Sequence, residues 1–414
     1  MAWVEQRFEG SPLEDVKRAV REEIRSLSLE RRVTSGQSVA VAVGSRGIGN
    51  LAAIVEQTLR ELEGLGLNPF VVPAMGSHGG ATAEGQRAVL ASLGVTEDSM
   101  QVQVRSSMDT RLLGPSSLGL PVHIDAAALQ ADHIVAVNRI KAHTKFKAPI
   151  ESGLMKMLAV GLGKHAGASL LHRLAIRHSL EAVILDSART VLAEAPVLFG
   201  MGVVENGLGE PHRVQAFLPQ SIEEGEAGLL ALAKELAPKI PFKEVDLLIV
   251  DQIGKDISGT GMDTNVTGRN RDILGDFTAG PGVKRILIRD LSPGTKGNAL
   301  GIGLADFCVR RAVQKMDLEA TYTNAMTGIS PEKAAIPMHL PTDREAICSA
   351  LHSLGDWRPE AVRVVRIRDT LHLTRLQVSE ALTTDLPETC SLLSSPQAMA
   401  FDAQGNLPGA EPQA

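Results

Sequence analysis

Short apolar runs and longer stretches of helical periodicity alternate along this chain. Residues 38–43, Ser-Val-Ala-Val-Ala-Val, have the length and the β-branched content of a buried strand. Residues 51–62 repeat apolar side chains at helical spacing, and Gly64 and Gly66 then end the helix. This alternation predicts an α/β fold with mostly parallel sheets covered by helices. Further strands are predicted at 70–73, 133–140, 245–250, 285–289 and 362–367, and further helices at 13–27, 82–93, 153–162, 168–194, 222–237 and 299–316.

The alternation is interrupted once, near the middle of the chain. A length of 414 residues suggests two or three domains. Two prolines follow the predicted helix 222–237, and a second series of strands then begins. We therefore predict an N-terminal domain at residues 1–240 and a C-terminal α/β domain at residues 241–394. Residues 395–414, rich in Pro, Gly, Gln and Ala, are expected to form a disordered tail.

Charge and composition argue against several classes of function. A net charge of −6 and 3% aromatic residues disfavour a nucleic-acid-binding protein, which normally needs a basic surface or stacking aromatics. The cysteines Cys308, Cys348 and Cys390 form no CxxC pair, so no zinc ribbon or iron–sulfur cluster is expected, and their sparse number fits a reducing compartment.

The chain contains no stretch of 18 apolar residues that would span a membrane. Two acidic residues stand among the first nine, where a signal peptide would be basic and then apolar. We therefore expect a cytoplasmic protein that binds neither membrane nor nucleic acid.

Four loops that follow predicted strands carry polar or charged side chains, and most of them are rich in glycine. Ligands of open α/β sheets bind beyond the carboxyl ends of the strands. Loops at equivalent strand ends can therefore converge on one ligand site. The four loops are residues 44–50, 75–82, 141–145 and 254–265.

The first of these loops, Gly44-Ser45-Arg46-Gly47-Ile48-Gly49, has more than one interpretation. Its glycines suit a phosphate cradle, and it is similar to the nucleotide loop of short-chain dehydrogenases. Those enzymes need a Tyr-x-x-x-Lys pair, but the single tyrosine, Tyr322, has Met326 at that spacing. Arg46 is suited to grip a carboxylate in a bidentate fork. The alternative is a tight turn with one solvated arginine.

Two histidines follow strands and are candidates for acid–base chemistry. His78 lies in a Gly-Ser-His-Gly-Gly loop with no apolar neighbour to pack it. His143 lies among Lys141, Lys145 and Lys147, whose charges would lower its pKa and favour binding of an anion. A histidine that titrates near neutrality serves as a general acid or base. The alternative for each is a surface histidine without a functional role.

Lys156 stands in an otherwise apolar run, Gly153-Leu-Met-Lys-Met-Leu-Ala-Val. A buried lysine loses proton affinity and becomes a nucleophile, whereas a snorkelling lysine keeps its charge in water. His165 and His172 follow at a spacing of two helical turns, so they can share one face of a helix. The spacing alone leaves open which of them, if either, binds a metal.

The order and spacing of these residues resemble the nickel-dependent lactate racemase family. The resemblance is carried by an arginine in a loop after a strand, a Gly-x-His-Gly loop, a histidine after a later strand, and a Gly-x-x-Lys run followed by a histidine. It is best over residues 10–215. It implies a two-domain α/β protein with a ligand cleft between the domains. It also implies a nickel-pincer nucleotide, a pyridinium mononucleotide whose sulfur groups hold nickel.

The resemblance assigns a role to each matching residue. Lys156 matches the lysine that forms a thioamide with the cofactor, and His172 matches the histidine that completes the nickel coordination. His78 and His143 match the acid and base on opposite faces of the substrate, and Arg46 matches the arginine that holds it. The other residues expected to bind the cofactor are Gly44, Gly47 and Ser77.

The chain also departs from the family. Ala142 stands where the family has proline, and Ser152-Gly153 replaces a glycine pair before the lysine. These departures leave Lys147 and Lys164 as alternatives to Lys156.

In the second half, the loop at 261–269 lacks the glutamine and lysine with which lactate racemases bind substrate. We therefore expect Lys255 or Arg269 to bind the substrate. The substrate is expected to be an acidic or larger hydroxy acid, or a sugar acid.

The resemblance implies a racemase or epimerase of a 2-hydroxy acid, with the enzymes that build the cofactor as partners. Two alternatives remain: another nucleotide-dependent oxidoreductase or lyase, and a non-catalytic protein that binds an anionic small molecule. Two histidines at two strand ends favour a catalyst, because a carrier needs anion-binding groups more than an acid–base pair. The sequence gives no indication of the oligomeric state.

Overall fold

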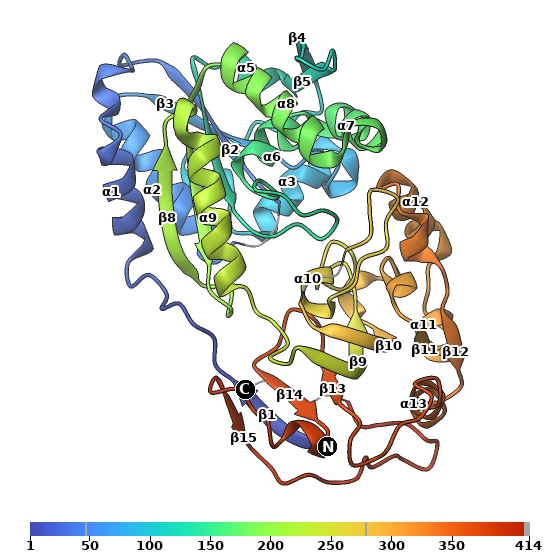
Figure 1. Cartoon of the computed structure of the whole chain (residues 1–414). Helices are drawn as coiled ribbons and strands as arrows, with labels where there is room; N and C mark the ends of the chain where they lie inside the picture. Colours follow the sequence, from blue (N-terminus) through green and yellow to red (C-terminus); the bar gives the residue numbers. More distant parts are fainter. Residues whose placement is uncertain (46–47, 278–279, 410–414) are drawn as a thin grey trace. The chain divides into compact units, whose positions relative to one another are not determined.

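The computed structural model describes residues 1–45, 48–277 and 280–409, and the chain divides into two compact units (Figure 1). The N-terminal unit is Glu9–Ala237, and the C-terminal unit is Pro238–Ala414 together with Met1–Phe8. Each unit has a mostly parallel sheet with its own apolar core. The predicted α/β class is confirmed in both units.

The sheet of the N-terminal unit has the strand order β3-β2-β6-β7-β8. The first four strands are parallel, and β8 is antiparallel to β7. The parallel order brings the carboxyl ends of β3, β2 and β6 to the same edge. The strands are β2 (Ser38–Val43), β3 (Asn68–Pro73), β6 (His133–Arg139), β7 (Val197–Glu205) and β8 (Pro211–Phe217), with a separate hairpin of β4 (Thr110–Pro115) and β5 (Pro121–Asp125).

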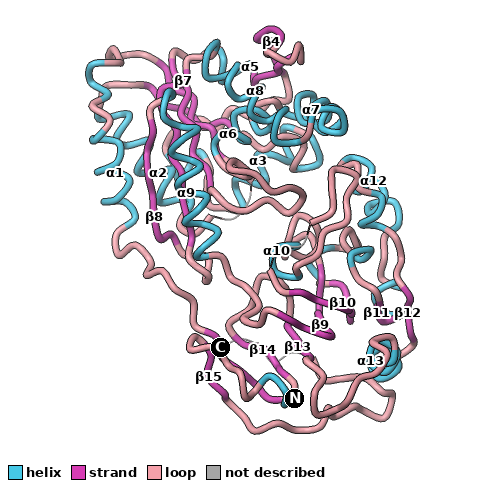
Figure 2. Tube along the Cα trace, viewed as in Figure 1, coloured by secondary structure: helices cyan, strands magenta, loops and turns pink. Residues whose placement is uncertain are grey.

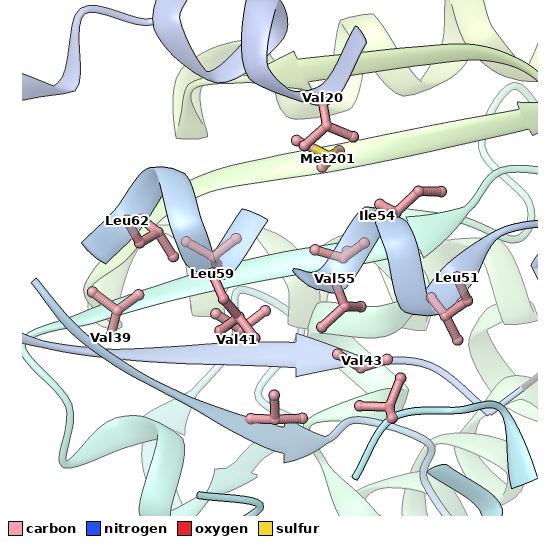
Figure 3. Close-up of a cluster of buried hydrophobic side chains, with 14 of the residues drawn as sticks. Val20, Val39, Val41, Val43, Leu51, Ile54, Val55, Leu59, Leu62 and Met201 are labelled. Atoms are coloured by element: carbon pink, nitrogen blue, oxygen red, sulfur yellow. The ribbon is translucent and has the colours of Figure 1, made fainter. Parts of the chain in front are cut away.

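Helices cover both faces of this sheet. On one face, alternate residues of β2, among them Val39, Val41 and Val43, point at helix α2, and Val20 of α1 lies by Met201 of β7 in the same core (Figure 3). On the other face, Gly200 and Gly202 of β7 leave room for α6 and α9, whose Leu154, Ile222 and Leu229 would meet any added Cβ. The helices are α1 (Val16–Ser26), α2 (Leu51–Gly64), α3 (Ala83–Ser92), α4 (Glu97–Met100), α5 (Ala126–Leu129), α6 (Leu154–Lys156), α7 (Lys164–His178), α8 (Leu180–Glu194) and α9 (Ile222–Leu236).

The sheet of the C-terminal unit has eight strands in the order β12-β11-β10-β9-β13-β14-β1-β15. Strands β12, β11, β10, β9 and β13 are parallel to one another. Strands β14, β1 and β15 follow, each antiparallel to the strand before it. This unit contains more loop than the N-terminal unit (Figure 2). Its strands are β1 (Ala2–Gln6), β9 (Glu244–Ile253), β10 (Gly282–Leu291), β11 (Phe307–Val309), β12 (Met338–Leu340), β13 (Val364–Ile367), β14 (Arg375–Val378) and β15 (Cys390–Leu392), and its helices are α10 (Thr264–Thr267), α11 (Arg310–Gln314), α12 (Leu318–Thr327) and α13 (Asp343–His352).

The first residues of the chain belong to the C-terminal unit, not to the N-terminal domain predicted at residues 1–240. Strand β1 pairs antiparallel with β14 and β15 through a register that includes Val4 opposite Leu376 and Leu392. Val4 is fully buried in the core of that unit. A pairing between residues nearly 400 positions apart leaves no local signal in the sequence.

Two predicted helices are wrong in part. The segment predicted as one helix at 168–194 forms α7 and α8, which are separated at Ser179, where φ is +72°. The segment predicted as a helix at 299–316 instead contains a short 3-10 turn, strand β11 and helix α11. Gly301, at φ +102°, and Gly303 break the helical pattern there. Neighbouring backbone oxygens leave no room for a side chain at either glycine.

The described part of the C-terminal segment, residues 395–409, packs on the C-terminal unit, so the predicted disorder is wrong for these residues. Phe401 and Leu407 join an apolar cluster beneath the sheet. The carbonyl oxygens of Leu407 and Pro408 each accept a hydrogen bond of 2.7 Å, from Arg289 and Arg366 respectively. The polar composition of the segment does not indicate these few contacts.

Candidate functional site

The carboxyl edge of the N-terminal sheet gathers the predicted site loops. Ser45 follows β2, His78 follows β3, and His143 follows β6. These three strands are neighbours in the sheet, with β2 in the middle. The hydroxyl of Ser45 and Nδ1 of His78 are in hydrogen-bond contact, so the first two loops touch. His78 itself is exposed.

His143 and Lys156 lie side by side, 13 residues apart in sequence. The Nε2 of His143 is 2.8 Å from the Nζ of Lys156. On the other side of the ring, the backbone N–H of Lys145 donates to Nδ1 over 3.0 Å. The Phe146 ring also packs near the imidazole, with ring centroids 4.7 Å apart. Both ring nitrogens are therefore engaged, and the ring is held in one orientation.

The surroundings of His143 favour its neutral form. Burial is the main cause that holds the pKa of His143 well below its ordinary value. Positive charge on Lys156 or Lys145 lowers the pKa of His143 further. The lowering predicted from the lysine cluster is in the expected direction, although burial contributes more than charge.

Lys156 is presented by an irregular helix. The three-residue helix α6 begins after Gly153 and continues into a π-turn at Met157–Gly161, closed by a hydrogen bond of 2.8 Å from Leu162 N–H to the Met157 carbonyl. Such π-turns are rare and occur frequently at functional sites. The turn also places Met157 against Gly44, where an added Cβ would lie 3.4 Å from the Met157 methyl carbon. The loop after β2 therefore touches the segment that carries Lys156.

A buried carboxylate holds the start of this helix. Glu226 of α9 is fully buried and accepts the N–H of Met155 over 2.7 Å. Asn138, at the end of β6, donates to the carbonyl of Gly153 over 2.8 Å. Burial raises the pKa of Glu226 to about 7. The backbone before Lys156 is thus anchored from a strand on one side and from a helix on the other.

A second buried carboxylate holds the loop of His143. Glu151 accepts the N–H groups of His143 at 2.6 Å and Ala148 at 3.1 Å. It also forms an ion pair of 2.7 Å with Lys234. Glu151 is fully buried and accepts the backbone N–H of His143. It therefore fixes the position of the backbone from which the imidazole side chain extends.

The structure distinguishes between the two candidate metal ligands on α7. His172 is half-buried and lies close enough to His143 for its charge to lower the pKa of that residue. His165 is exposed and contacts Ser169 on its own helix, at 3.5 Å. His172 therefore joins the cluster of His143 and Lys156, in agreement with the position that the resemblance favours.

The three candidate lysines differ in burial and in the groups that their amines contact. Lys164 is fully buried and forms an ion pair of 2.8 Å with Asp125, so it is not accessible for attachment. Lys147 is exposed, and its Nζ donates to the carbonyl of His143 over 3.2 Å. Of the three, Lys156 is the one whose amine meets a histidine side chain.

Four further residues were predicted for this site: Gly44, Ser77, Arg46 and Gly47. Gly44 follows β2, and an added Cβ would lie 2.9 Å from the Asn138 side-chain oxygen. Ser77 is half-buried and directly precedes His78. Arg46 and Gly47 lie outside the described residues.

Of the two substrate residues predicted in the C-terminal unit, Arg269 needs a correction. Its guanidinium forms an ion pair of 2.6 Å with Asp306 and donates to the carbonyls of Leu304, Val283 and Lys284. A fork occupied in this way connects protein segments and is not open to a substrate carboxylate. Lys255 follows β9, and its Nζ donates to the Gly259 carbonyl at 2.6 Å and to Asn324 at 2.8 Å.

Sequence reasoning missed Glu151, Asn138 and Glu226. Glu226 left one signal, because it interrupts the apolar face formed by Ile222, Leu229 and Leu230 of the same helix. An acid on the buried face of a helix requires a partner. The partners of Glu151 and Asn138 are backbone groups 3 to 15 residues away, which only the folded loop brings near.

Two kinds of structure are absent from the described parts of the chain. No helix there is both long and apolar enough to cross a membrane. No group of three or more His, Cys, Asp and Glu side chains there is arranged to hold a metal ion.

Comparisons with known proteins give a family match for the first part of the chain. Residues 5–182 match the family model of the lactate racemase N-terminal domain. The chain is also similar to the lactate racemase apoprotein from Thermoanaerobacterium thermosaccharolyticum, with 18% sequence identity, 68% of this chain and 69% of that chain covered, and a TM-score of 0.46. A comparison with curated proteins gives no match. The resemblance seen in the sequence is confirmed over residues 5–182, which match the lactate racemase N-terminal domain.

Proposed function

We propose that this protein is a racemase or epimerase of a 2-hydroxy acid that works with a nickel-pincer nucleotide. The match of residues 5–182 to the lactate racemase N-terminal domain supports racemase activity in general. The observation that carries the more specific proposal is the 2.8 Å contact between His143 Nε2 and Lys156 Nζ. It joins the proposed base to the proposed point of cofactor attachment.

The hydrogen bonds of His143 also bear on the state of Lys156. A neutral imidazole has one donor and one acceptor nitrogen. Because Nδ1 accepts from the Lys145 N–H, Nε2 carries the proton and donates to the amine of Lys156. The amine can accept this bond only in its neutral form, which is the form that acts as a nucleophile. Loss of the Lys156 charge leaves burial, the main cause, to keep His143 neutral.

The donor set of the cluster fits the cofactor. Lys156 would hold the cofactor through its amine, and His172 would add an imidazole, which is a suitable ligand for nickel. Since the described side chains form no complete metal site, the remaining ligands would have to come from the sulfur groups of the nucleotide. When bound, the cofactor supplies a reversible acceptor for the hydride at C2 of the substrate.

The chain's own residues would manage the protons and the orientation of the substrate. A histidine that is neutral at physiological pH takes the proton of the C2 hydroxyl, and a second histidine acts from the opposite face. His143 and His78 are proposed for these two roles. For His143 the role requires that the ring give up the Lys145 N–H bond, so that the proton moves to Nδ1 and Nε2 becomes the acceptor. Arg46 is proposed to hold the carboxylate, so that only the substituents at C2 rearrange.

The test is to produce the chain together with the enzymes that build the cofactor, and then to measure its intact mass and metal content. We expect a mass increase that maps to Lys156 and about one nickel per chain, as the proposed single site requires. Lys156→Ala should lose the modification, whereas the matched control Lys147→Ala should keep it. Stereoisomers of several 2-hydroxy acids would then be assayed. An unmodified mass, obtained when a lactate racemase is loaded in parallel, would contradict the proposal.

A further inference from the structure

A cavity of about 480 Å³ lies at the amino-terminal edge of the sheet in the C-terminal unit. Its wall includes Phe307, the first residue of β11, and Ile336 and Pro337, which directly precede β12. Lys255 follows β9 at the other end of the same parallel strands. The volume is within the range of small-molecule sites, about 300–1,000 Å³. The cavity is therefore large enough for a small ligand, and it is separate from the substrate residue predicted on this unit.

Two arginines, Arg271 and Arg285, bring positive charge to the wall of this cavity. The wall also contains Asp306, but its carboxylate already binds Arg269 at 2.6 Å and accepts the N–H of Ile286 over 2.8 Å. The guanidinium of Arg271 lies 3.9 Å from this carboxylate, too far for a hydrogen bond, and its side chain is 50% exposed. Positive charge is therefore in excess at the cavity.

Arg285 is held in place by uncharged groups and keeps donors for a ligand. Its Nε donates to the Ser353 hydroxyl over 2.8 Å, and Nη2 and Nη1 donate to the carbonyls of Ser353 and Lys284, each over 3.1 Å. A guanidinium has five N–H groups, so two remain. Within the described part of the chain, no ion pair neutralises Arg285. In this respect it differs from Arg269, whose charge is neutralised by Asp306.

Much of the remaining wall is apolar. Phe307 is buried, whereas Ile336 is 44% exposed and presents apolar surface to water at the cavity. A ligand that covers this surface is stabilised by the hydrophobic effect. The cavity therefore combines cationic groups, which attract an anion, with a wall that favours an apolar group.

We propose that this cavity is a second binding site, for a small organic carboxylate with an apolar body. Arg271 and Arg285 bind the carboxylate, because a guanidinium can bond both of its oxygens. Phe307 and Ile336 contact the apolar body. A sugar acid or a short hydroxy acid lacks that body, so the ligand of this site differs in chemistry from the substrate of the proposed function. The site belongs to the C-terminal unit alone and does not depend on the cofactor.

The first test is calorimetric titration of the full-length chain, without cofactor, with straight-chain carboxylates. Octanoate should bind at about one molecule per chain. Acetate has the charge alone and 1-octanol the apolar chain alone, so each should bind at least about tenfold more weakly. From butyrate to octanoate, each added methylene should lower Kd about fourfold. Equal affinity for acetate and octanoate, or no binding of octanoate, would overturn the inference.

The second test locates the bound octanoate by substitution. Arg271→Ala should raise Kd about 10- to 100-fold, the effect of lost hydrogen bonds between charged groups. Ile336→Glu should abolish binding, because it adds a negative charge to the wall. Both positions are exposed, so both variants should fold, which circular dichroism checks. The matched control is Arg310→Ala, which removes an exposed arginine of the same unit outside the cavity. An unchanged Kd in Arg271→Ala would mean that octanoate binds elsewhere and would contradict the proposal.

Discussion

The carboxyl edges of the two sheets hold their histidines in opposite tautomers. In the N-terminal unit, a backbone N–H donates to Nδ1 of His143, so its proton lies on Nε2. In the C-terminal unit, the carboxylate of Asp369 accepts from Nδ1 of His372, so its Nε2 is an acceptor. His143 meets a lysine amine in a half-buried cluster, whereas the side chain of His372 is 40% exposed. The comparison shows that the group bonded to Nδ1 decides whether a histidine serves as a donor or as an acceptor at the site.

The largest expected effect separates these two histidines by kinetics. His143→Gln should lower kcat about 10²- to 10⁴-fold, the usual contribution of a general acid or base. His372→Gln should leave kcat unchanged, because the proposed mechanism does not use this histidine. Steady-state kinetics of both variants, each with cofactor content checked by mass, measure the split. Equal losses of kcat in the two variants would break the comparison.

A second pair of variants compares the stability of the two units. Each unit contains a fully buried lysine in an ion pair, Lys164 with Asp125 and Lys333 with Asp272, both at 2.8 Å. Removing the acid strands a buried charge, so Asp125→Ala and Asp272→Ala should each cost about 3–5 kcal/mol of unfolding free energy.

The two tryptophans make the effects separable, because Trp3 and Trp357 both belong to the C-terminal unit. Asp272→Ala should shift the urea transition seen by tryptophan fluorescence. Asp125→Ala should shift the transition seen by circular dichroism more than the one seen by fluorescence. If both probes shift equally in both variants, the units unfold together.

A third prediction sharpens the view that Glu226 is a neutral positioning residue near Lys156. Its pKa is raised in the folded state from an ordinary value of 4.5 to about 7. The folded chain therefore holds more protons than the unfolded chain between these values, and the associated stability is lost as pH rises through about 7. Glu226→Gln cannot ionise, so its stability relative to the unaltered chain should rise by roughly 3 kcal/mol from pH 4.5 to pH 8.

The control is Glu223→Gln on the same helix. A hydrogen bond from Arg189 lowers the pKa of Glu223, so the stability it contributes is lost as pH falls. Its pH dependence should have the opposite sign and a smaller size, because the pair is largely exposed. Urea titrations at several pH values measure both. Parallel curves for Glu226→Gln and the unaltered chain would show that Glu226 is ionised throughout.

The smallest effect is expected at Arg269, whose contacts stabilise the fold of the C-terminal unit. Arg269→Lys keeps the charge beside Asp306 but loses the planar fork that reaches the backbone carbonyls. We expect a loss of about 1 kcal/mol in unfolding free energy and no change in KM. A KM that rises for every substrate would restore the role in substrate binding predicted from the sequence.

The part of the candidate site that could be predicted lies near strand ends. His78 and His143 follow strands, and Lys156 interrupts an apolar run after the same strand as His143, so glycine and charged residues mark all three. Their roles stay predictions. Glu151 and Asn138 were not predicted, because each acts through a backbone group that only the folded loop brings near.

The sequence by itself determined the α/β class, the strands of the parallel core and the residues at the strand ends, because periodicity and glycine act over a few neighbouring residues. Only the tertiary structure decided that β1 joins the distant sheet, that Lys164 is buried against Asp125 while Lys156 meets His143, and that His172 rather than His165 belongs to the cluster. Each of these depends on contacts between segments far apart in the chain. Burial and hydrogen bonding between such segments decide which of several chemically similar side chains can react.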